Sequence, residues 1–357
     1  MNFKLLVIED DDEFYNNMKF FLDRKIREFN ENSNIKLYFY RAKDLEIAKK
    51  EINNRYYIGY SIDQQIPNSK GDVDKEFGAE ATKTIFKSNI ISLKIMLSNY
   101  SFDIKFSGYV KEEAYFHKPS DDLEDWANYL VENSVKYITE DIFEDAINYL
   151  PLSLGNILHR YNIDKEQDKI KSLISFFELN LRYIYASVLC AIGKKSRNIW
   201  QNIKMISELK EIKENIDKYS LSIIKKEEIS KLLSDELLDT LDKIRVLRNN
   251  VTHSHKEYIL TKKDKLLFSL LLLYDNYFYT NPFIYIQNHT MKNNSLKVNA
   301  QKLIGNPSRY KFEQLSPPYV NEEEIYQIFR EDSKEIISLS HYFQRDKTQY
   351  IINIEVK

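Results

Sequence analysis

Near its N-terminus the chain reads Lys4-Leu-Leu-Val-Ile8, and four carboxylates follow directly: Glu9, Asp10, Asp11 and Asp12. A short, continuous apolar run of this kind is typical of a β-strand that is buried on both faces of a sheet. The carboxylates then stand at the carboxyl end of the strand, which is the edge where open parallel sheets bind their ligands. The stretch therefore predicts an α/β unit with an acidic site at one sheet edge.

Strands and helices alternate over the residues that follow. We expect amphipathic helices at about 13–29, 45–53, 79–87 and 121–133, and further strands at 35–41, 56–62, 93–98 and 114–117. Such alternation predicts a doubly wound sheet of parallel strands. The third strand ends at Asp63, so we expect this carboxylate at the same edge as Glu9 and Asp10. Carboxylates that converge in this way repel one another and form a site for a hard divalent cation.

At these strand ends the segment resembles the receiver domain of two-component response regulators. The resemblance is carried by Glu9 and Asp10 after the first strand, Asp63 and Pro67 after the third, Ser98 at the end of the fourth, and Tyr115 and Lys118-Pro119 at the last. The family fold is a doubly wound parallel sheet. Its chemistry is phosphorylation of an aspartate by a histidine kinase or another phosphodonor.

The resemblance implies a role for each matched residue. Asp63 would be the nucleophile that forms an acyl phosphate, and Lys118 would pair with the phosphoryl charge. Ser98 and Tyr115 would be the switch residues that respond to phosphorylation. Mg²⁺ would be held by four groups, namely the carboxylates of Glu9, Asp10 and Asp63 and the backbone carbonyl of Gln65. The alternative for this unit is a degenerate receiver that keeps the fold and is never phosphorylated.

One loop departs from the family pattern. The segment from Pro67 to the next helix is longer than the family norm and contains two glycines, Gly71 and Gly78. We expect Gly78, rather than Gly71, to open the helix. The longer loop leaves Asp63 in place, and we expect it to alter which kinase docks.

The chain is long enough for more than one domain, and its pattern changes twice. Pro151 and Gly155 mark a boundary after the first unit. Helical patterns that begin at about Lys165, Trp200, Ser230 and Lys262 predict a four-helix bundle, and alternating residues beyond Pro282 predict a small antiparallel β-rich appendix. We therefore expect a receiver-like domain at 1–135, a helical linker at 136–162, a helical domain at 163–280 and a β-rich region at 281–357.

The composition is that of a globular protein, with 43% hydrophobic and 30% charged residues and only 7 Gly and 7 Pro. A net charge of −2 means that any nucleic-acid contact must come from a local basic face. The single cysteine, Cys190, excludes a disulfide framework and a cysteine-based zinc site. No stretch approaches the ~20 apolar residues of a membrane span, and the N-terminal apolar run is too short for a signal peptide. We therefore expect a cytoplasmic protein with no membrane partner.

A second polar group lies near the end of the third helical pattern, which reads Arg245-Val-Leu-Arg248-Asn249-Asn-Val-Thr-His253-Ser-His255. On an α-helix Arg245, Asn249 and His253 lie on one face because they are spaced by four. Arg248 lies about 140° around the helix from His253. These two side chains can point into one site only if the helix ends or bends near Thr252.

The motif Arg248-Asn249-x-x-x-His253, placed at the end of the third helix, resembles the HEPN superfamily of ribonucleases. The resemblance implies cofactor-independent RNA cleavage at a homodimer interface, with a 2′,3′-cyclic phosphate as product. His253 would act as general base or acid at the ribose 2′-hydroxyl, and Arg248 would stabilise the charge of the transition state. Asn249 would orient the histidine or a phosphate oxygen. Weaker RNA contacts are expected from three flanking residues: Arg245, His255 and Lys256.

Together these patterns predict a multidomain α/β plus α protein in which a receiver domain controls an endoribonuclease. HEPN nucleases commonly act as toxins or antiviral effectors, so a role in stress or defence is implied. One alternative is a non-enzymatic two-component signalling adaptor that uses the helical domain for dimerisation or partner binding. Another is an antitoxin-like partner of a separately encoded enzyme.

Overall fold

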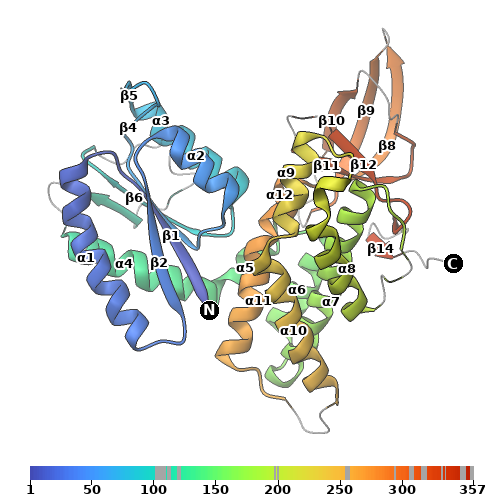
Figure 1. The fold of residues 1–357 in the computed structure, drawn as a ribbon, viewed down its shortest axis with the longest axis horizontal. Coiled ribbons are helices and arrows are strands. Elements are labelled where there is room, and N and C mark those ends of the chain that lie inside the picture. The colour runs from blue at the N-terminus through green and yellow to red at the C-terminus, as the bar shows by residue number, and fades with distance from the viewer. Residues whose placement is uncertain are drawn as a thin grey trace. The chain divides into compact units, whose positions relative to one another are not determined.

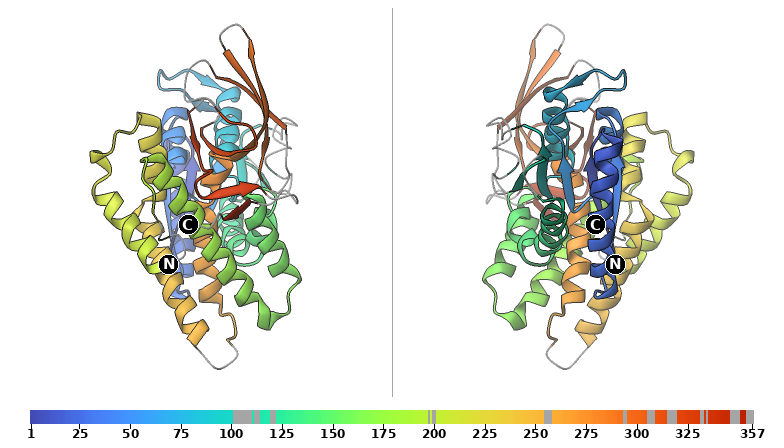
Figure 2. Two further views of the ribbon diagram at one scale, coloured as in Figure 1. Left: turned by 90° about the vertical axis from the view of Figure 1, so that its right-hand side faces the viewer. Right: turned by 90° about the vertical axis from the view of Figure 1, so that its left-hand side faces the viewer.

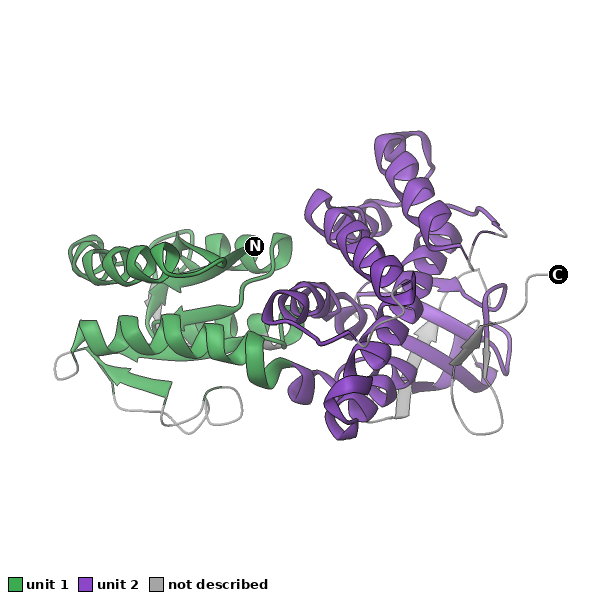
Figure 3. Cartoon of the chain, turned by 90° about the horizontal axis from the view of Figure 1, so that it is seen from below, with its two compact units in different colours: residues 1–142 green, residues 143–357 purple. Residues whose placement is uncertain are grey.

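The structure is a computed structural model, and it describes residues 1–100, 110, 114–118, 122–196, 198, 201–253, 258–292, 295–304, 309–314, 320–330, 333, 335–345 and 351–353. The chain divides into two compact units, Met1–Ile142 and Phe143–Lys357 (Figure 3). The first unit contains a parallel sheet, and the second contains helices and an antiparallel sheet (Figures 1 and 2).

The first unit is a five-stranded parallel sheet with the strand order β2-β1-β3-β6-β7. Its strands are β1 (Asn2–Ile8), β2 (Lys36–Ala42), β3 (Gly59–Ile62), β6 (Leu93–Ser98) and β7 (Tyr115–His117). Its helices are α1 (Asp12–Glu31), α2 (Leu45–Asn54), α3 (Lys75–Ser88) and α4 (Leu123–Lys136), which continues into the π-helical turn η3 (Tyr137–Asp141). Helix α1 packs with α4 and α2 packs with α3, one pair on each side of the sheet (Figure 1). This is the doubly wound order in which the chain reverses direction beside β1, so the predicted fold class is confirmed for this unit.

Local sequence explains where these elements begin. Leu5 to Ile8 are all buried, as the continuous apolar run predicts for a central strand. Aspartates cap three of the helices: Asp11 accepts from the amide of Phe14, Asp44 from that of Ile47 and Asp122 from that of Glu124. Each cap satisfies a backbone donor that the first helical turn leaves without a partner.

The second unit begins with a series of helices. They are α5 (Ile142–Ala146, whose first residue ends the first unit), α6 (Leu152–Ile163), α7 (Glu166–Ala191), α8 (Asn202–Glu214), the short 3₁₀ turn η5 (Ile216–Lys218), α9 (Ile223–Leu232), α10 (Asp235–His253), α11 (Lys262–Tyr274) and α12 (Asn276–Thr280). Helix α7 contacts α6, α8, α9 and α10, so it forms the centre of the helical part. The pattern that was expected to form one helix from Ser230 is divided in two. The helix is interrupted at Leu233 and Ser234. The hydroxyl of Ser234 accepts a hydrogen bond from the amide of Leu237 and so caps the start of α10.

Helix α7 is long and apolar enough to cross a membrane by length and composition, and it is the one such helix in the described part of the chain. In the structure, 67% of its apolar window is buried inside the protein. Its side chains pack among the neighbouring helices, as expected for the central helix of a bundle.

A five-stranded antiparallel sheet follows, with the order β10-β9-β8-β11-β12. Its strands are β8 (Phe283–Lys292), β9 (Ser295–Lys302), β10 (Arg309–Gln314), β11 (Ile325–Phe329) and β12 (Glu335–Ser338), and a separate pair is formed by β13 (Phe343–Arg345) and β14 (Ile351–Asn353). The antiparallel β-structure predicted beyond Pro282 is confirmed, and β8 and β9 form a hairpin that pairs directly from Lys292 and Ser295. The sheet packs on the helices through Phe283, whose ring lies 5.1 Å from that of Tyr183 on α7.

Candidate functional site

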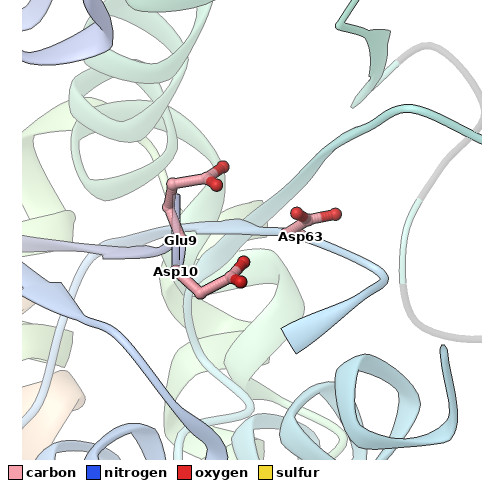
Figure 4. Close-up of side chains that lie close together, drawn as sticks. All are labelled: Glu9, Asp10 and Asp63. Atoms are coloured by element: carbon pink, nitrogen blue, oxygen red, sulfur yellow. The ribbon is translucent and has the colours of Figure 1, made fainter. Parts of the chain in front are cut away.

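Three carboxylates meet at the carboxyl edge of the parallel sheet. Glu9 and Asp10 follow β1, and Asp63 follows the neighbouring strand β3 (Figure 4). Each offers an oxygen atom, and these atoms all lie within 4.8 Å of one another. Glu9 and Asp63 are buried, whereas Asp10 is half-buried. The sequence prediction that strand ends bring these side chains together is therefore met by the geometry of the sheet.

Backbone hydrogen bonds hold this edge in register. The amide of Asp63 donates to the carbonyl of Ile8 at 3.1 Å, which extends the β1–β3 ladder by one residue past the end of one strand. The amide of Glu9 donates to the carbonyl of Ala42 at 3.0 Å and does the same between β1 and β2. The carboxylate of Asp63 also accepts from the amide of Gln65 at 3.2 Å. The acidic residues thus start from a rigid backbone.

Lys118, which follows β7, closes the cluster. Its ammonium lies 2.6 Å from Oδ2 of Asp63 and 2.8 Å from Oε2 of Glu9, and its side chain is 6% exposed. It also lies 4.6 Å from the centre of the Phe14 ring. Its backbone amide donates to the carbonyl of Ser98 at 2.9 Å, which ties the lysine to the end of β6.

Burial controls the protonation of this cluster. Desolvation raises the pKa of Glu9 from 4.5 to about 7, although the charge of Lys118 opposes the shift. Desolvation also raises the pKa of Asp63, again against Lys118. The pKa of Lys118 is raised, because the carboxylates of Asp63 and Glu9 outweigh the effect of its own burial. Near neutral pH Lys118 is therefore protonated, and the carboxyl group of Glu9 can bind or release a proton.

The donor set fits a hard divalent cation. With all groups ionised, Glu9, Asp10 and Asp63 carry three negative charges and Lys118 carries one positive charge, so two negative charges remain. Carboxylate oxygens at this separation are the ligands that Mg²⁺ and Ca²⁺ prefer. Gln65 lies beside the cluster through its amide contact with Asp63, and the role of its carbonyl as a ligand stays a prediction.

The predicted switch residues lie on neighbouring strands. Ser98 is buried at the end of β6, and its hydroxyl accepts from the amide of Tyr100 at 3.4 Å. Tyr115 opens β7, where it pairs in register with Met96, and it is half-buried. Pro119 lies outside the described residues. A movement of Ser98 or Tyr115 on phosphorylation stays a prediction.

The loop after Asp63 forms a structure that the sequence did not reveal. Ile66–Pro67 (β4) pairs with Val73–Asp74 (β5), and Asn68 closes the turn through its side chain and backbone. Helix α3 begins at Lys75, so the expectation that Gly78 opens the helix was wrong. Gly78 lies instead in the first turn, where an added Cβ would be 2.2 Å from the carbonyl oxygen of Gln64. This glycine allows α3 to approach the backbone that carries Asp63.

Two further residues at the site were missed by the sequence analysis. The hydroxyl of Tyr100 donates to Oε1 of Gln65 at 2.6 Å and so links the end of β6 to the loop after β3. Arg41, the penultimate residue of β2, hydrogen-bonds the backbone of both Glu9 and Asp10. Neither residue belongs to a motif, so only the strand order brings them to the site.

No family model matches the chain, and no curated protein matches it. Among solved structures, similar chains include a CheY-like response regulator receiver domain protein from Methanospirillum hungatei JF-1, at 17% identity and a TM-score of 0.30, covering 38% of this chain and 97% of that chain. The similarity is to response-regulator receiver domains.

Two other structures belong to the same group. A response regulator protein from Burkholderia pseudomallei, with a phosphorylated aspartic acid, calcium ion and citrate, is 17% identical, with a TM-score of 0.28, covering 45% of this chain and 87% of that chain. The Francisella response regulator 1452 receiver domain is 23% identical, with a TM-score of 0.26, covering 37% of this chain and 98% of that chain.

In the second unit, the predicted RNA-cleaving residues lie at the end of α10. Nε of Arg248 donates to Oε1 of Glu178 on α7 at 3.0 Å, and Nη1 lies 3.3 Å from Oδ1 of Asn249. His253 is exposed and is the last residue of α10. The helix continues through Thr252, whose hydroxyl donates to the carbonyl of Arg248. Within the part of the chain that the structure describes, no hydrogen bond or ion pair joins Arg248 to His253.

Of the flanking residues, Arg245 has an acidic partner that reduces its availability for RNA contact. Nε of Arg245 donates to Oδ1 of Asp242 at 2.8 Å, and Asp242 also lies 3.5 Å from the ammonium of Lys210. The charge of Arg245 is therefore partly neutralised. His255 and Lys256 lie outside the described residues.

Proposed function

We propose that the first unit is a phosphoacceptor domain and that Asp63 takes the phosphoryl group. The observation that carries the proposal is the cluster of Glu9, Asp10 and Asp63 with the ammonium of Lys118 on two of its carboxylates. A structural ion pair would need only one carboxylate for one lysine. The excess of negative charge at a strand edge is what a divalent cation and a phosphoryl group together would neutralise.

The residues suggest the order of events. A carboxylate oxygen of Asp63 attacks the phosphorus of a phosphodonor, the bond from phosphorus to the leaving group breaks, and an acyl phosphate forms. Lys118 then pairs with a phosphoryl oxygen in place of the Asp63 oxygen that it now contacts. When bound by Glu9, Asp10 and Asp63, Mg²⁺ would supply positive charge for the incoming phosphoryl group. A histidine kinase or a small acyl phosphate would serve as donor.

Labelling with acetyl phosphate and Mg²⁺ tests this proposal. We expect the wild-type protein to gain one phosphoryl group by intact-mass spectrometry, and Asp63→Asn to gain none. Asp72→Asn is the matched control, because Asp72 is an exposed carboxylate in the adjoining turn. Equal labelling of wild type and Asp63→Asn would reject Asp63 as the acceptor. Absence of labelling in the wild type would favour a degenerate receiver.

For the second unit we propose RNA cleavage, controlled by the first. Arg248 supports this idea because Glu178 holds one edge of its guanidinium while the side chain remains 31% exposed. His253 is exposed five residues later, so both groups are accessible to a substrate. Since the two residues lie about 140° apart on one regular helix, a complete site would combine copies from two chains of a homodimer.

In such a composite site each group has one task. The ribose 2′-oxygen attacks the adjacent phosphorus, the bond to the 5′-oxygen breaks, and a 2′,3′-cyclic phosphate remains. His253 takes the proton from the 2′-hydroxyl or gives one to the leaving oxygen, and Arg248 stabilises the negative charge that develops on the phosphate. Asn249 contacts Arg248 and would help to orient its guanidinium.

The test for this activity uses labelled single-stranded RNA in EDTA, with His253→Ala as the comparison. Cleavage by wild type alone would support a metal-independent nuclease. A parallel reaction with Mg²⁺ and acetyl phosphate would report whether phosphorylation changes the rate. If neither reaction yields cleavage, the helical part is better explained as the dimerising or partner-binding surface of a signalling adaptor.

A further inference from the structure

Arg41 hydrogen-bonds the loop that carries Glu9 and Asp10. Its Nε donates to the carbonyl of Glu9 at 2.9 Å, and Nη2 donates to the carbonyl of Asp10 at 2.9 Å. Nη1 lies 2.5 Å from Oδ1 of Asp12. The guanidinium also stacks on Tyr15, with its central carbon 4.1 Å from the ring centre. Its side chain is 12% exposed, and each of its three nitrogen atoms contacts the loop or the first residue of α1.

The contacts with Glu9 and Asp10 are to their backbone and not to their carboxylates. The carbonyl groups of Glu9 and Asp10 are fixed by one rigid fork of donors, which restricts the peptide planes from which both side chains project. Lys43, which directly follows β2, adds a contact of 2.6 Å to Asp12 at the start of α1, so both ends of the loop segment are held by the end of β2 and the residue after it. A carboxylate whose backbone is held in place loses less conformational freedom when it binds a cation.

We propose that Arg41 is a positioning residue that sets the divalent-cation affinity of the Glu9–Asp10–Asp63 cluster. The inference rests on the proposed function, because it assumes that the cluster binds a cation. Arg41 contacts the backbone of Glu9 and Asp10 and none of the three carboxylates of the cluster. It would therefore not touch a cation or a phosphoryl group bound there. It acts by keeping Glu9 and Asp10 turned toward Asp63 before the cation arrives.

The sign of the effect separates this role from a purely electrostatic one. A guanidinium close to the cluster repels a divalent cation, so loss of its charge alone would tighten binding. Loss of a group that orients metal ligands weakens binding, typically by roughly 10–100-fold. The two explanations therefore predict changes in opposite directions for the same substitution.

The experiment is a calorimetric titration with Mg²⁺ alone, on full-length protein, of wild type, Arg41→Gln and Arg41→Lys. We expect Arg41→Gln to weaken Mg²⁺ binding by about tenfold or more. Arg41→Lys should keep the charge but lose the fork and should also bind more weakly. Arg55→Gln is the matched control, because Arg55 pairs with Glu51 and stacks on Tyr40, away from the acidic cluster. The Mg²⁺ concentration that gives half-maximal labelling by acetyl phosphate should rise in both Arg41 variants, in step with the loss of Mg²⁺ affinity.

Unchanged or tighter Mg²⁺ binding by Arg41→Gln would overturn the proposal. If circular dichroism shows that Arg41→Gln does not fold, Asp12→Asn provides the second variant. It weakens the ion pair between Asp12 and Arg41 at a side chain that is 66% exposed. We expect a smaller loss of affinity for Asp12→Asn, and unchanged affinity there would also overturn the proposal. Absence of Mg²⁺ binding by the wild type would instead reject the proposed function.

Discussion

The ammonium of Lys118 bridges Asp63 and Glu9, at 2.6 Å and 2.8 Å respectively. The three residues follow β7, β3 and β1, so one cation links the ends of three strands. Both carboxylates are buried, and they depend on this lysine for their counter-charge as long as no other cation is bound.

Replacing Lys118 by glutamine should therefore destabilise the protein. Removal of one partner from a buried ion pair leaves an uncompensated charge and typically costs about 3–5 kcal/mol. We expect a lower urea midpoint for Lys118→Gln in EDTA and a substantial recovery in Mg²⁺, because the divalent cation supplies the missing charge. Lys25→Gln, which breaks an ion pair with the exposed Glu132, should change the midpoint little. Equal midpoints for the two variants would contradict this account of the cluster.

Mg²⁺ affinity should fall as the solution becomes more acidic than about pH 7. Burial raises the pKa of Glu9 to about 7, so below that pH the cation must displace a proton from the cluster. For one displaced proton the affinity changes by about tenfold per pH unit, and it levels off above pH 7. Calorimetric titrations between about pH 5.5 and 8.5 measure this dependence. Glu9→Gln should bind more weakly and lose part of the slope, whereas a flat profile for wild type would contradict the assignment.

The same shift has a consequence for stability without metal. The folded-state pKa of Glu9 lies above its ordinary value of 4.5, so the folded protein retains a proton that the unfolded chain releases. Stability conferred by this group is present at low pH and is lost as the pH rises from about 4.5 to about 7. In EDTA, Glu9→Gln should therefore be more stable than wild type at about pH 8, with a smaller difference at about pH 5. Chemical unfolding at both pH values checks the sign.

Gly78→Ala should disturb both stability and phosphorylation. Its Cβ would lie 2.2 Å from the carbonyl oxygen of Gln64 and 2.6 Å from that of Asp63, so either α3 or the backbone that carries Asp63 must move. We expect a loss of stability of about 1–3 kcal/mol and slower labelling by acetyl phosphate. Gly71→Ala is a useful contrast, because Gly71 has open space and a φ of +86°. It should cost about 1 kcal/mol, by backbone strain alone, and should leave labelling unchanged.

For the second unit, the contact between Glu178 and Arg248 provides a graded test of RNA cleavage. Arg248→Ala should lower the cleavage rate by roughly 10²–10³-fold if its guanidinium stabilises the transition state. Glu178→Gln should produce a smaller decrease, since it loosens the held edge of Arg248 without removing the fork. Arg245→Gln is the control, because Asp242 already occupies its Nε. Similar rates for Arg248→Ala and wild type in EDTA would remove Arg248 from the mechanism.

A buried carboxyl group in the second unit should show a pH effect of its own. Burial raises the pKa of Asp275 well above its ordinary value, and both of its oxygens accept from the amide of Asn180. The folded state therefore retains a proton that the unfolded chain loses, and stability falls as the pH rises above about 3.8. Asp275→Asn, which is neutral and of similar size, should be more stable than wild type at about pH 8. This difference in stability should be smaller at about pH 4. Parallel pH profiles of the two proteins would contradict this.

The acidic site could be located from the sequence because its residues stand at strand ends. Continuous apolar runs identify buried parallel strands, and parallel strands bring their carboxyl ends to one edge of a sheet. Glu9, Asp10 and Asp63 needed no finer information than that, whereas Lys118 was identified through the resemblance to receiver domains. The start of α3 was predicted wrongly because Gly78 was taken for a helix boundary, whereas its role is to permit close packing against the backbone of Gln64.

The sequence by itself determined the parallel sheet, the edge that carries the carboxylates and the helical nature of the stretch after Ser230, because hydrophobic periodicity follows directly from local geometry. Only the tertiary structure decided which charged groups are partners. Arg41 is 32 residues from Glu9, and Arg248 is 70 residues from Glu178. Side-chain hydrogen bonds depend on atomic positions that many long-range packing contacts set together, and no local pattern records them. The residues of the acidic site are thus readable from the chain, but the contacts that hold them in place are not.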